Sequence, residues 1–247
     1  MTRFYADISL AVNEPVILPE AIFHHWVRVL RAQIGAEAIL FNGKGGEYEV
    51  TLQDIQKKSA TVHVNRFNPE NRCPAYQVTL GQVMSKGDRM DYAIQKATEL
   101  GVHSIQLLVS ERCEMRLKYE RDQKKIEHWQ HIAIAACEQC GMNIVPKVLP
   151  PLSLEEWLKL TAAANATKLV LAPAKQSVQF TTPFPDKFCL LIGPEGGLSE
   201  AEIELSNTHG FSNWTLGARV LRTETAPVTA LSALLFAHSL TLVGKNS

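Results

Sequence analysis

The hydrophobic pattern of this 247-residue chain changes at residues 68–74, and the change requires two regions that fold in different ways. The segment Asn68-Pro69-Glu70-Asn71-Arg72-Cys73-Pro74 contains two prolines and no periodic apolar positions, which is typical of a boundary between domains. We therefore expect one domain over residues 1–70 and a second over residues 75–247. The whole chain is long enough to bury a core without disulfide bonds.

Residues 1–67 have the pattern of a small β-rich domain. Alternating or continuous apolar residues predict strands at Arg3–Ile8, Val16–Leu18, Glu37–Phe41, Glu47–Ile55 and Ala60–Phe67. The sequence Asn42-Gly43-Lys44-Gly45-Gly46 predicts a hairpin turn. One helix is expected between the strands, from Glu20 to Arg31. Together these elements predict a small barrel with a single helix.

After residue 74 strands alternate with helices. Short apolar runs predict strands at Val78–Val83, Ile105–Val109, Lys168–Ala172, Phe188–Ile192 and Trp214–Leu216. Helices are expected over Asp88–Leu100, from about Arg121 to Gly141, and from Ser153 through Leu160. This alternation predicts an α/β domain with a parallel sheet covered on both faces. Ligands of such sheets bind beyond the carboxyl ends of the strands, so the loops there are the candidate site.

The first candidate loop is Gly193-Pro194-Glu195-Gly196-Gly197, which follows a strand and precedes a helix capped by Ser199 and Glu202. Its glycines let backbone N–H groups approach a ligand closely. The Lys and Ser/Thr of a phosphate-binding loop are missing, and the spacing is not that of a dinucleotide site. Glu195 favours a cationic or hydroxyl-rich ligand over a polyphosphate. The alternative is a plain tight turn.

The second candidate loop runs from Leu216 to Pro227 and again leads from a strand into a helix. Capping of that helix by Thr223 or Thr225, with Glu224 on the helix dipole, would explain three of its polar residues. It would not explain Arg219 and Arg222, which lie at the unfavourable positive end of the helix. We therefore expect an anionic partner there.

A third segment begins at Lys86-Gly87-Asp88-Arg89 and continues through a helix to Gly101. Met90, Ala93, Ile94, Ala97 and Leu100 form its apolar face. Lys86, Arg89 and Lys96 lie off that face, and each taken singly is expected to be solvated.

Composition excludes several other classes. The chain has 25 Lys and Arg against 25 Asp and Glu, which argues against binding of nucleic acid by bulk charge but permits a local basic patch. The five cysteines are unsuited to a complete disulfide framework, and the first residues do not have the pattern of a secretory signal, so a cytoplasmic protein is expected. Cys137-Glu138-Gln139-Cys140 lacks a second ligand pair, so free thiols and no metal are expected.

One stretch invites a membrane interpretation, because no side chain from Thr225 to Gly244 is charged. It contains several polar residues that are costly in hydrocarbon, namely Thr229, Ser232, His238 and Ser239. We expect a buried C-terminal helix there and no association with a membrane.

Six motifs together resemble a known family, the 16S rRNA uridine N3-methyltransferases called RsmE, in the SPOUT superfamily. They are Arg28-Val29-Leu30-Arg31, Gln95-Lys96-Ala97-Thr98-Glu99-Leu100-Gly101, Ser110-Glu111-Arg112, Ala136-Cys137-Glu138-Gln139, Ile192-Gly193-Pro194-Glu195-Gly196-Gly197 and Leu221-Arg222-Thr223-Glu224-Thr225-Ala226. The last two in combination are highly specific, and the resemblance covers nearly the whole chain.

The resemblance implies a PUA-like N-terminal β-barrel for RNA, and a C-terminal SPOUT α/β domain with a trefoil knot. It implies a homodimer that binds S-adenosylmethionine (SAM) and methylates N3 of a uridine in 16S rRNA, either in free rRNA or in the 30S subunit. The cofactor-binding residues it implies are Leu171, Ile192, Gly193, Pro194, Glu195, Gly196, Gly197, Leu216, Gly217, Leu221, Thr223 and Thr225.

N3 of uracil is a poor nucleophile while protonated, so the reaction needs a base or a cation that stabilises the deprotonated ring. We expect Arg222 to be that cation and Glu224 to be its orienting partner or the base. The predicted RNA contacts are Arg3, Arg28, Arg31, Lys86, Lys96 and Arg112. The family pattern usually has arginine where this chain has Met142, and Arg116 or Lys118 would have to supply any contact that it makes.

Two other functions fit the same fold. One is a non-catalytic RNA-binding or ribosome-assembly protein. The other is a SPOUT enzyme that modifies another position, such as a ribose 2′-oxygen in transfer RNA. Binding of SAM separates the enzymes from the first alternative, and the identity of the methylated atom separates the two enzymes.

Overall fold

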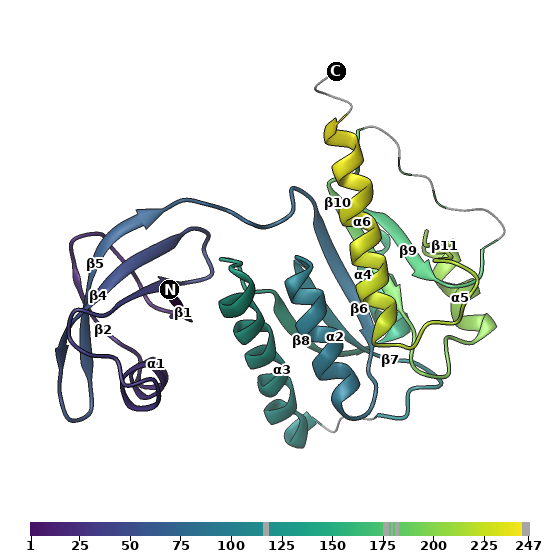
Figure 1. Cartoon of the computed structure of the whole chain (residues 1–247). Helices are drawn as coiled ribbons and strands as arrows, with labels where there is room; N and C mark the ends of the chain where they lie inside the picture. The colour runs from purple at the N-terminus through teal and green to yellow at the C-terminus, as the bar shows by residue number, and fades with distance from the viewer. Residues whose placement is uncertain (116–118, 175–177, 179, 181–182, 244–247) are drawn as a thin grey trace. The chain divides into compact units, whose positions relative to one another are not determined.

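The computed structural model describes residues 1–115, 119–174, 178, 180 and 183–243. The chain forms two compact units, whose elements are labelled in Figure 1. The first unit contains Met1–Cys73 together with Cys137–Val145, and the second contains Pro74–Ala136 and Pro146–Ser247. Residues 137–145 therefore belong to the first unit although they lie far from it in the sequence.

The first unit is built on a five-stranded sheet. In spatial order its strands are β1 (Thr2–Tyr5), β3 (Glu37–Phe41), β4 (Glu47–Ile55), β5 (Ala60–Asn68) and β2 (Pro15–Ile17). The β1–β3 pair is parallel and the other pairs are antiparallel. One face of the sheet is apolar, and its core includes Phe4, Trp26, Leu40, Leu52 and Val62. This core forms because inward-facing residues alternate along each strand.

Two elements of the first unit differ from the sequence prediction. The helix predicted over Glu20–Arg31 is an α-helix only over α1 (Glu20–Phe23) and continues as a π-helix over η1 (His24–Val29). The strand predicted over Arg3–Ile8 ends at Tyr5, because the chain turns away from β3 after Ala6.

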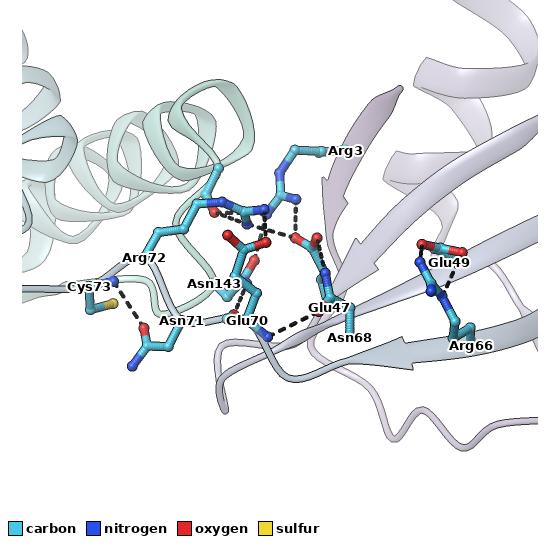
Figure 2. Close-up of polar contacts among 11 residues, drawn as sticks. Arg3, Glu47, Glu49, Arg66, Asn68, Glu70, Asn71, Arg72, Cys73 and Asn143 are labelled. Atoms are coloured by element: carbon cyan, nitrogen blue, oxygen red, sulfur yellow. Dashed lines mark hydrogen bonds and ion pairs between the residues drawn. The ribbon is translucent and has the colours of Figure 1, made fainter.

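A polar network holds residues 137–145 within the first unit (Figure 2). Glu47 forms ion pairs with Arg3 and with Arg72, the second at 3.1 Å. Arg3 also donates a hydrogen bond of 2.6 Å to Oδ1 of Asn143, and Arg72 donates one of 3.1 Å to the carbonyl of Gly141. The side chains of Arg3 and Glu47 are only 11% and 5% exposed. This network is therefore a buried part of the unit and not a feature of its surface.

Ionisation of Glu47 depends on these two arginines. Burial opposes the charged form, but the hydrogen bonds and charges of Arg3 and Arg72 outweigh it, so the pKa of Glu47 lies below its ordinary value. Removing the carboxylate would leave a buried guanidinium without its main partner.

The second unit is built on a six-stranded sheet in which every recorded strand pair is parallel. The strand order is β11 (Ser212–Trp214), β9 (Thr167–Leu171), β10 (Lys187–Ile192), β6 (Gln77–Val83), β7 (Ser104–Val109) and β8 (Lys147–Ser153). The helices are α2 (Asp88–Glu99), α3 (Tyr119–Cys140), α4 (Leu154–Ala162), α5 (Glu200–Thr208) and α6 (Thr225–Val243). The last residues of α3, from Cys137, belong to the first unit. The predicted parallel α/β sheet is confirmed, and the trefoil knot stays a prediction.

The elements of this unit follow the local sequence signals closely. Ser153 and Ser199 cap α4 and α5 with reciprocal hydrogen bonds to Glu156 and Glu202, as the capping-box spacing predicts. β8 was not predicted, because Pro150 and Pro151 argue against a strand. β8 lies at the edge of the sheet, where prolines are tolerated. The strand predicted over Trp214–Leu216 was also misplaced, since β11 ends at Trp214.

The C-terminal helix α6 differs from the buried helix that the sequence predicts. Its Ala230, Leu231 and Leu234 are buried, and α6 packs on α2, but only 28% of Thr225–Leu242 is buried. By length and composition alone this segment could cross a membrane, but core helices of soluble proteins can be equally long and apolar. The exposed apolar side chains of α6 are Leu235, Phe236, Leu240 and Leu242.

Replacing Glu47 by glutamine should destabilise the protein by about 3 kcal/mol, the usual cost of breaking a buried ion pair. Urea unfolding measures this difference. The matched control is Glu49→Gln, which removes the more exposed pair with Arg66 on the same sheet and should cost no more than about 1 kcal/mol. Because folding lowers the pKa of Glu47, its contribution is present above the unfolded pKa and is lost as the pH falls through the folded pKa. If Glu47→Gln and Glu49→Gln lowered the free energy of unfolding equally at neutral pH, the stabilising role of the buried Glu47 ion pairs would be contradicted.

Candidate active site

A cavity of about 430 Å³ lies at the carboxyl ends of β9, β10 and β11, within the second unit. These ends meet at one edge of the sheet because the three strands are adjacent and parallel. The size is within the range of small-molecule sites. Nine of the residues predicted to bind the cofactor line the cavity, namely Leu171, Ile192, Gly193, Pro194, Gly197, Leu216, Gly217, Leu221 and Thr223.

Thr223 joins the two loops that border the cavity. Its hydroxyl donates a hydrogen bond of 2.7 Å to the carbonyl of Gly193 and accepts one of 3.2 Å from the side-chain amide of Gln82 on β6. Thr223 is only 5% exposed. Its hydroxyl is therefore committed to holding the loops together, which is not the helix-capping role considered from the sequence.

The lining of the cavity is mostly apolar, and two glycines shape it. Gly197 and Gly217 have φ angles of +68° and +82°, a conformation that side chains other than glycine rarely adopt. Arg219 is the charged residue among those that line the cavity. The cavity therefore offers apolar walls, close backbone approach and one cation.

Three predicted cofactor residues lie outside the lining. Glu195 forms an ion pair of 2.8 Å with Arg89 of α2, and the carbonyl of Gly196 accepts a hydrogen bond of 3.0 Å from Arg112. A side chain on Gly196 would meet Arg112 and not the cavity. Thr225 is the first residue of α6. Direct cofactor contacts of Glu195, Gly196 and Thr225 stay predictions.

The structure gives Glu224 a different cationic neighbour from the one expected. Oε2 of Glu224 lies 4.0 Å from Nε of Arg89. Arg222 is exposed, does not line the cavity, and contributes its carbonyl to the first turn of α6. The position of Arg89 beside both loops was not predicted, because it is one of several separate basic residues on its segment and because Glu195 and Glu224 are more than 100 residues away in the chain.

The basic residues predicted to bind RNA fall into two groups. Arg3 is buried in the ion-pair network around Glu47, which weighs against a phosphate contact. The others are at least partly accessible. Their recorded partners are the carbonyl of Lys57 for Arg28, Glu114 for Lys86, Glu99 for Lys96 and the carbonyl of Gly196 for Arg112. Arg31 is exposed. Arg116 and Lys118 lie outside the described residues.

Among the residues that the structure describes, no group of three or more His, Cys, Asp or Glu is placed to hold a metal ion. Cys73, Cys137, Cys140 and Cys189 are free thiols. Burial raises the pKa of Cys137 to about 12, so this thiol stays protonated at neutral pH.

Comparison with known proteins identifies the class. Residues 71–235 match the RNA methyltransferase domain, and residues 18–65 match the RNA methyltransferase PUA domain. The fold and the cavity at the strand ends thus belong to an RNA methyltransferase with a PUA-type N-terminal domain.

Individual relatives narrow this class to one family. The chain is 36% identical to the ribosomal RNA small subunit methyltransferase E of Buchnera aphidicola, with 94% of each chain covered. It is 33% identical to that of Bacillus subtilis, with 86% of each covered. The crystal structure of the Neisseria gonorrhoeae enzyme bound to S-adenosyl methionine has a TM-score of 0.89 and 37% identity, and 96% of this chain and 97% of that chain are covered. This chain belongs to the ribosomal RNA small subunit methyltransferase E family.

Proposed function

We propose that this protein transfers the methyl group of SAM to N3 of a uridine in 16S rRNA of the small ribosomal subunit. The observation that carries the proposal is the cavity between the Gly193–Gly197 loop and the 216–223 loop, in a chain of this family. The relative from Neisseria gonorrhoeae, which has the same fold, binds SAM.

The residues that line the cavity fit SAM. Its volume and apolar walls suit the adenine ring, and the glycine backbone permits hydrogen bonds to the polar edge of that ring. Arg219 suits the carboxylate of the cofactor. When bound, SAM supplies a methyl group that is activated by a positively charged sulfur. Thr223 then holds both loops at a fixed separation, which favours alignment of the reacting groups.

The protein must also present the target base. N3 lies on the Watson–Crick edge of uracil, so the target nucleotide has to be unpaired or displaced from its stack. The PUA-type first unit, with the exposed Arg28 and Arg31, is the proposed RNA reader. We retain Glu224 as the proposed base, and Arg222 as a cation that contacts either an RNA phosphate or the developing charge.

A cytoplasmic homodimer is part of the proposal. In a single chain α6 exposes the large apolar side chains of Leu235, Phe236, Leu240 and Leu242. Several large apolar side chains exposed along one helix favour an interface. A second copy of the chain would cover these side chains and bury more of α6.

We expect the purified protein to methylate small ribosomal subunits, or their naked 16S rRNA, from a strain that lacks this protein. Radiolabelled SAM measures the transfer, and mass spectrometry of the digested rRNA identifies the product. The expected product is 3-methyluridine. Failure to bind SAM would favour a non-catalytic RNA-binding protein, and a methylated ribose oxygen would favour a different modification. Comparing subunits with naked RNA identifies the preferred substrate.

Gly217→Val should weaken SAM binding by at least about 10-fold, because a β-branched residue at a positive φ forces the loop out of shape. Calorimetry measures the affinity, and thermal unfolding checks that the variant folds. Gly196→Ala is the control, since its added Cβ would lie at an ordinary distance of 3.6 Å from Arg112, away from the cavity. Unchanged SAM affinity in folded Gly217→Val protein would overturn the cofactor assignment.

Phe236→Glu should convert the dimer into a monomer, because Phe236 is 66% exposed in the single chain and the variant would bury a charge at the interface. Analytical ultracentrifugation measures the oligomeric state. Leu160→Glu on α4 is the control, since Leu160 is 70% exposed but lies on a different helix. A Phe236→Glu protein that stays dimeric would place the interface elsewhere.

A further inference from the structure

Arg89, in the first turn of α2, contacts both loops that border the cavity although it does not line the cavity itself. Its Nη1 lies 2.8 Å from Oε1 of Glu195 in the glycine loop. Its Nε lies 4.0 Å from Oε2 of Glu224, the residue after Thr223. The guanidinium of Arg89 therefore lies between two carboxylates, one from each loop.

Oε2 of Glu224 is buried and makes no hydrogen bond among the described residues. The side chain of Glu224 as a whole is 17% exposed, although Oε2 itself is buried. A buried carboxylate oxygen normally has a hydrogen-bond donor. Oε2 of Glu224 is therefore a hydrogen-bond acceptor without a donor, and it lies beside the positively charged guanidinium of Arg89.

Other unused polar atoms follow the neighbouring strands. The hydroxyls of Ser85 and Ser110 are also buried without a hydrogen-bond partner among the described residues. Each lies two residues beyond the paired positions Val83 and Leu108 on β6 and β7. Oε1 of Gln82 is a further unpaired atom, and the amide of the same side chain binds Thr223. These unpaired atoms lie at the carboxyl ends of β6 and β7, and β6 pairs with β10, whose loop borders the cavity.

We propose that Glu224 and Arg89 receive the target base in a polar subsite at these strand ends and recognise the Watson–Crick edge of uracil. This inference rests on the proposed function. The edge presents the N3–H group between two carbonyl oxygens, so a protein that recognises this edge needs a hydrogen-bond acceptor beside a donor. A carboxylate oxygen of Glu224 accepts the N3–H group, and Arg89 donates to a neighbouring carbonyl. Cytosine presents an unprotonated N3 at that position, which the carboxylate of Glu224 would repel.

The same two groups carry the proton step. The N3–H bond breaks, its proton passes to the carboxylate of Glu224, and its electron pair remains on N3. The negative charge spreads to the carbonyl oxygens, where Arg89 stabilises it. The electron pair on N3 forms the new bond to the methyl group, while the methyl–sulfur bond breaks and leaves its electron pair on sulfur. Glu195 is a positioning residue, because its ion pair fixes the orientation of the guanidinium.

The test compares Arg89→Ala, Arg89→Lys and Glu224→Gln with the wild-type protein in single turnover at saturating SAM and RNA. Arg89→Ala and Glu224→Gln should lower the rate about 100-fold or more, as for loss of one group that stabilises developing charge. SAM affinity should change by less than about threefold, since neither residue lines the cavity. Arg89→Lys keeps the charge and should fall between the wild type and Arg89→Ala. Lys159→Ala, which breaks an exposed pair with Glu155 on α4, is the matched control.

A second readout separates proton transfer from structural damage. RNA with 5-fluorouridine at the target position has a more acidic N3–H group and needs the base less. This substrate should restore much of the rate of Glu224→Gln as the pH rises from 7 to 9, and should leave the wild-type rate nearly unchanged. Absence of rescue would overturn proton transfer to Glu224.

The outcomes also separate this inference from the proposed function. Near wild-type rates for Arg89→Ala and Glu224→Gln, with 3-methyluridine formed by the wild type, would overturn the subsite alone. Absence of 3-methyluridine with the wild type would overturn the proposed function itself.

Discussion

The pairing of β10 with β9 on one side and β6 on the other determines where every part of the candidate site lies. The two ladders are parallel, so the loops after all three strands leave the same edge of the sheet. The loop after β10 therefore has different neighbours on its two sides. Toward β9 and β11 it borders the apolar cavity, and toward β6 it reaches Arg89. A cofactor and a target base can thus lie on opposite sides of one loop, with Thr223 fixing its position.

A second constraint lies in the path of α3. This helix begins in the second unit and ends in the first, where Tyr5 donates a backbone hydrogen bond of 2.9 Å to Glu138 and Arg3 binds Asn143. Met142 is buried against Phe41 and Cys137 in the same place. An exposed arginine at position 142 could reach RNA or a partner subunit, but a buried methionine contributes only packing. The segment after α3 therefore packs into the core of the first unit in this chain.

Local signals allowed much of the fold to be predicted. β3 and β4 have the predicted bounds, and both capping boxes form, because alternation and capping act within a few residues. The glycine loop could likewise be recognised from its own composition. Contacts between residues far apart in the sequence could not be predicted. Arg3 pairs with Glu47, 44 residues away, and Arg89 pairs with Glu195, 106 residues away. The burial of Arg3 and the position of Arg89 beside the glycine loop were therefore not foreseen.

The zero net charge of the chain bears on how it can bind RNA. Lys86 and Lys96 already have carboxylate partners, so a phosphate must compete with Glu114 and Glu99. Both pairs are partly or largely exposed, and such pairs contribute only about 0–1 kcal/mol. Exchanging these carboxylates for phosphates therefore costs little and releases counterions from the RNA. The buried pair of Arg3 and Glu47 cannot be exchanged in this way, because separating it would leave both charges uncompensated in the core of the unit. Pairing by itself therefore leaves Lys86 and Lys96 as candidate RNA contacts, whereas burial of its ion pair weighs against Arg3.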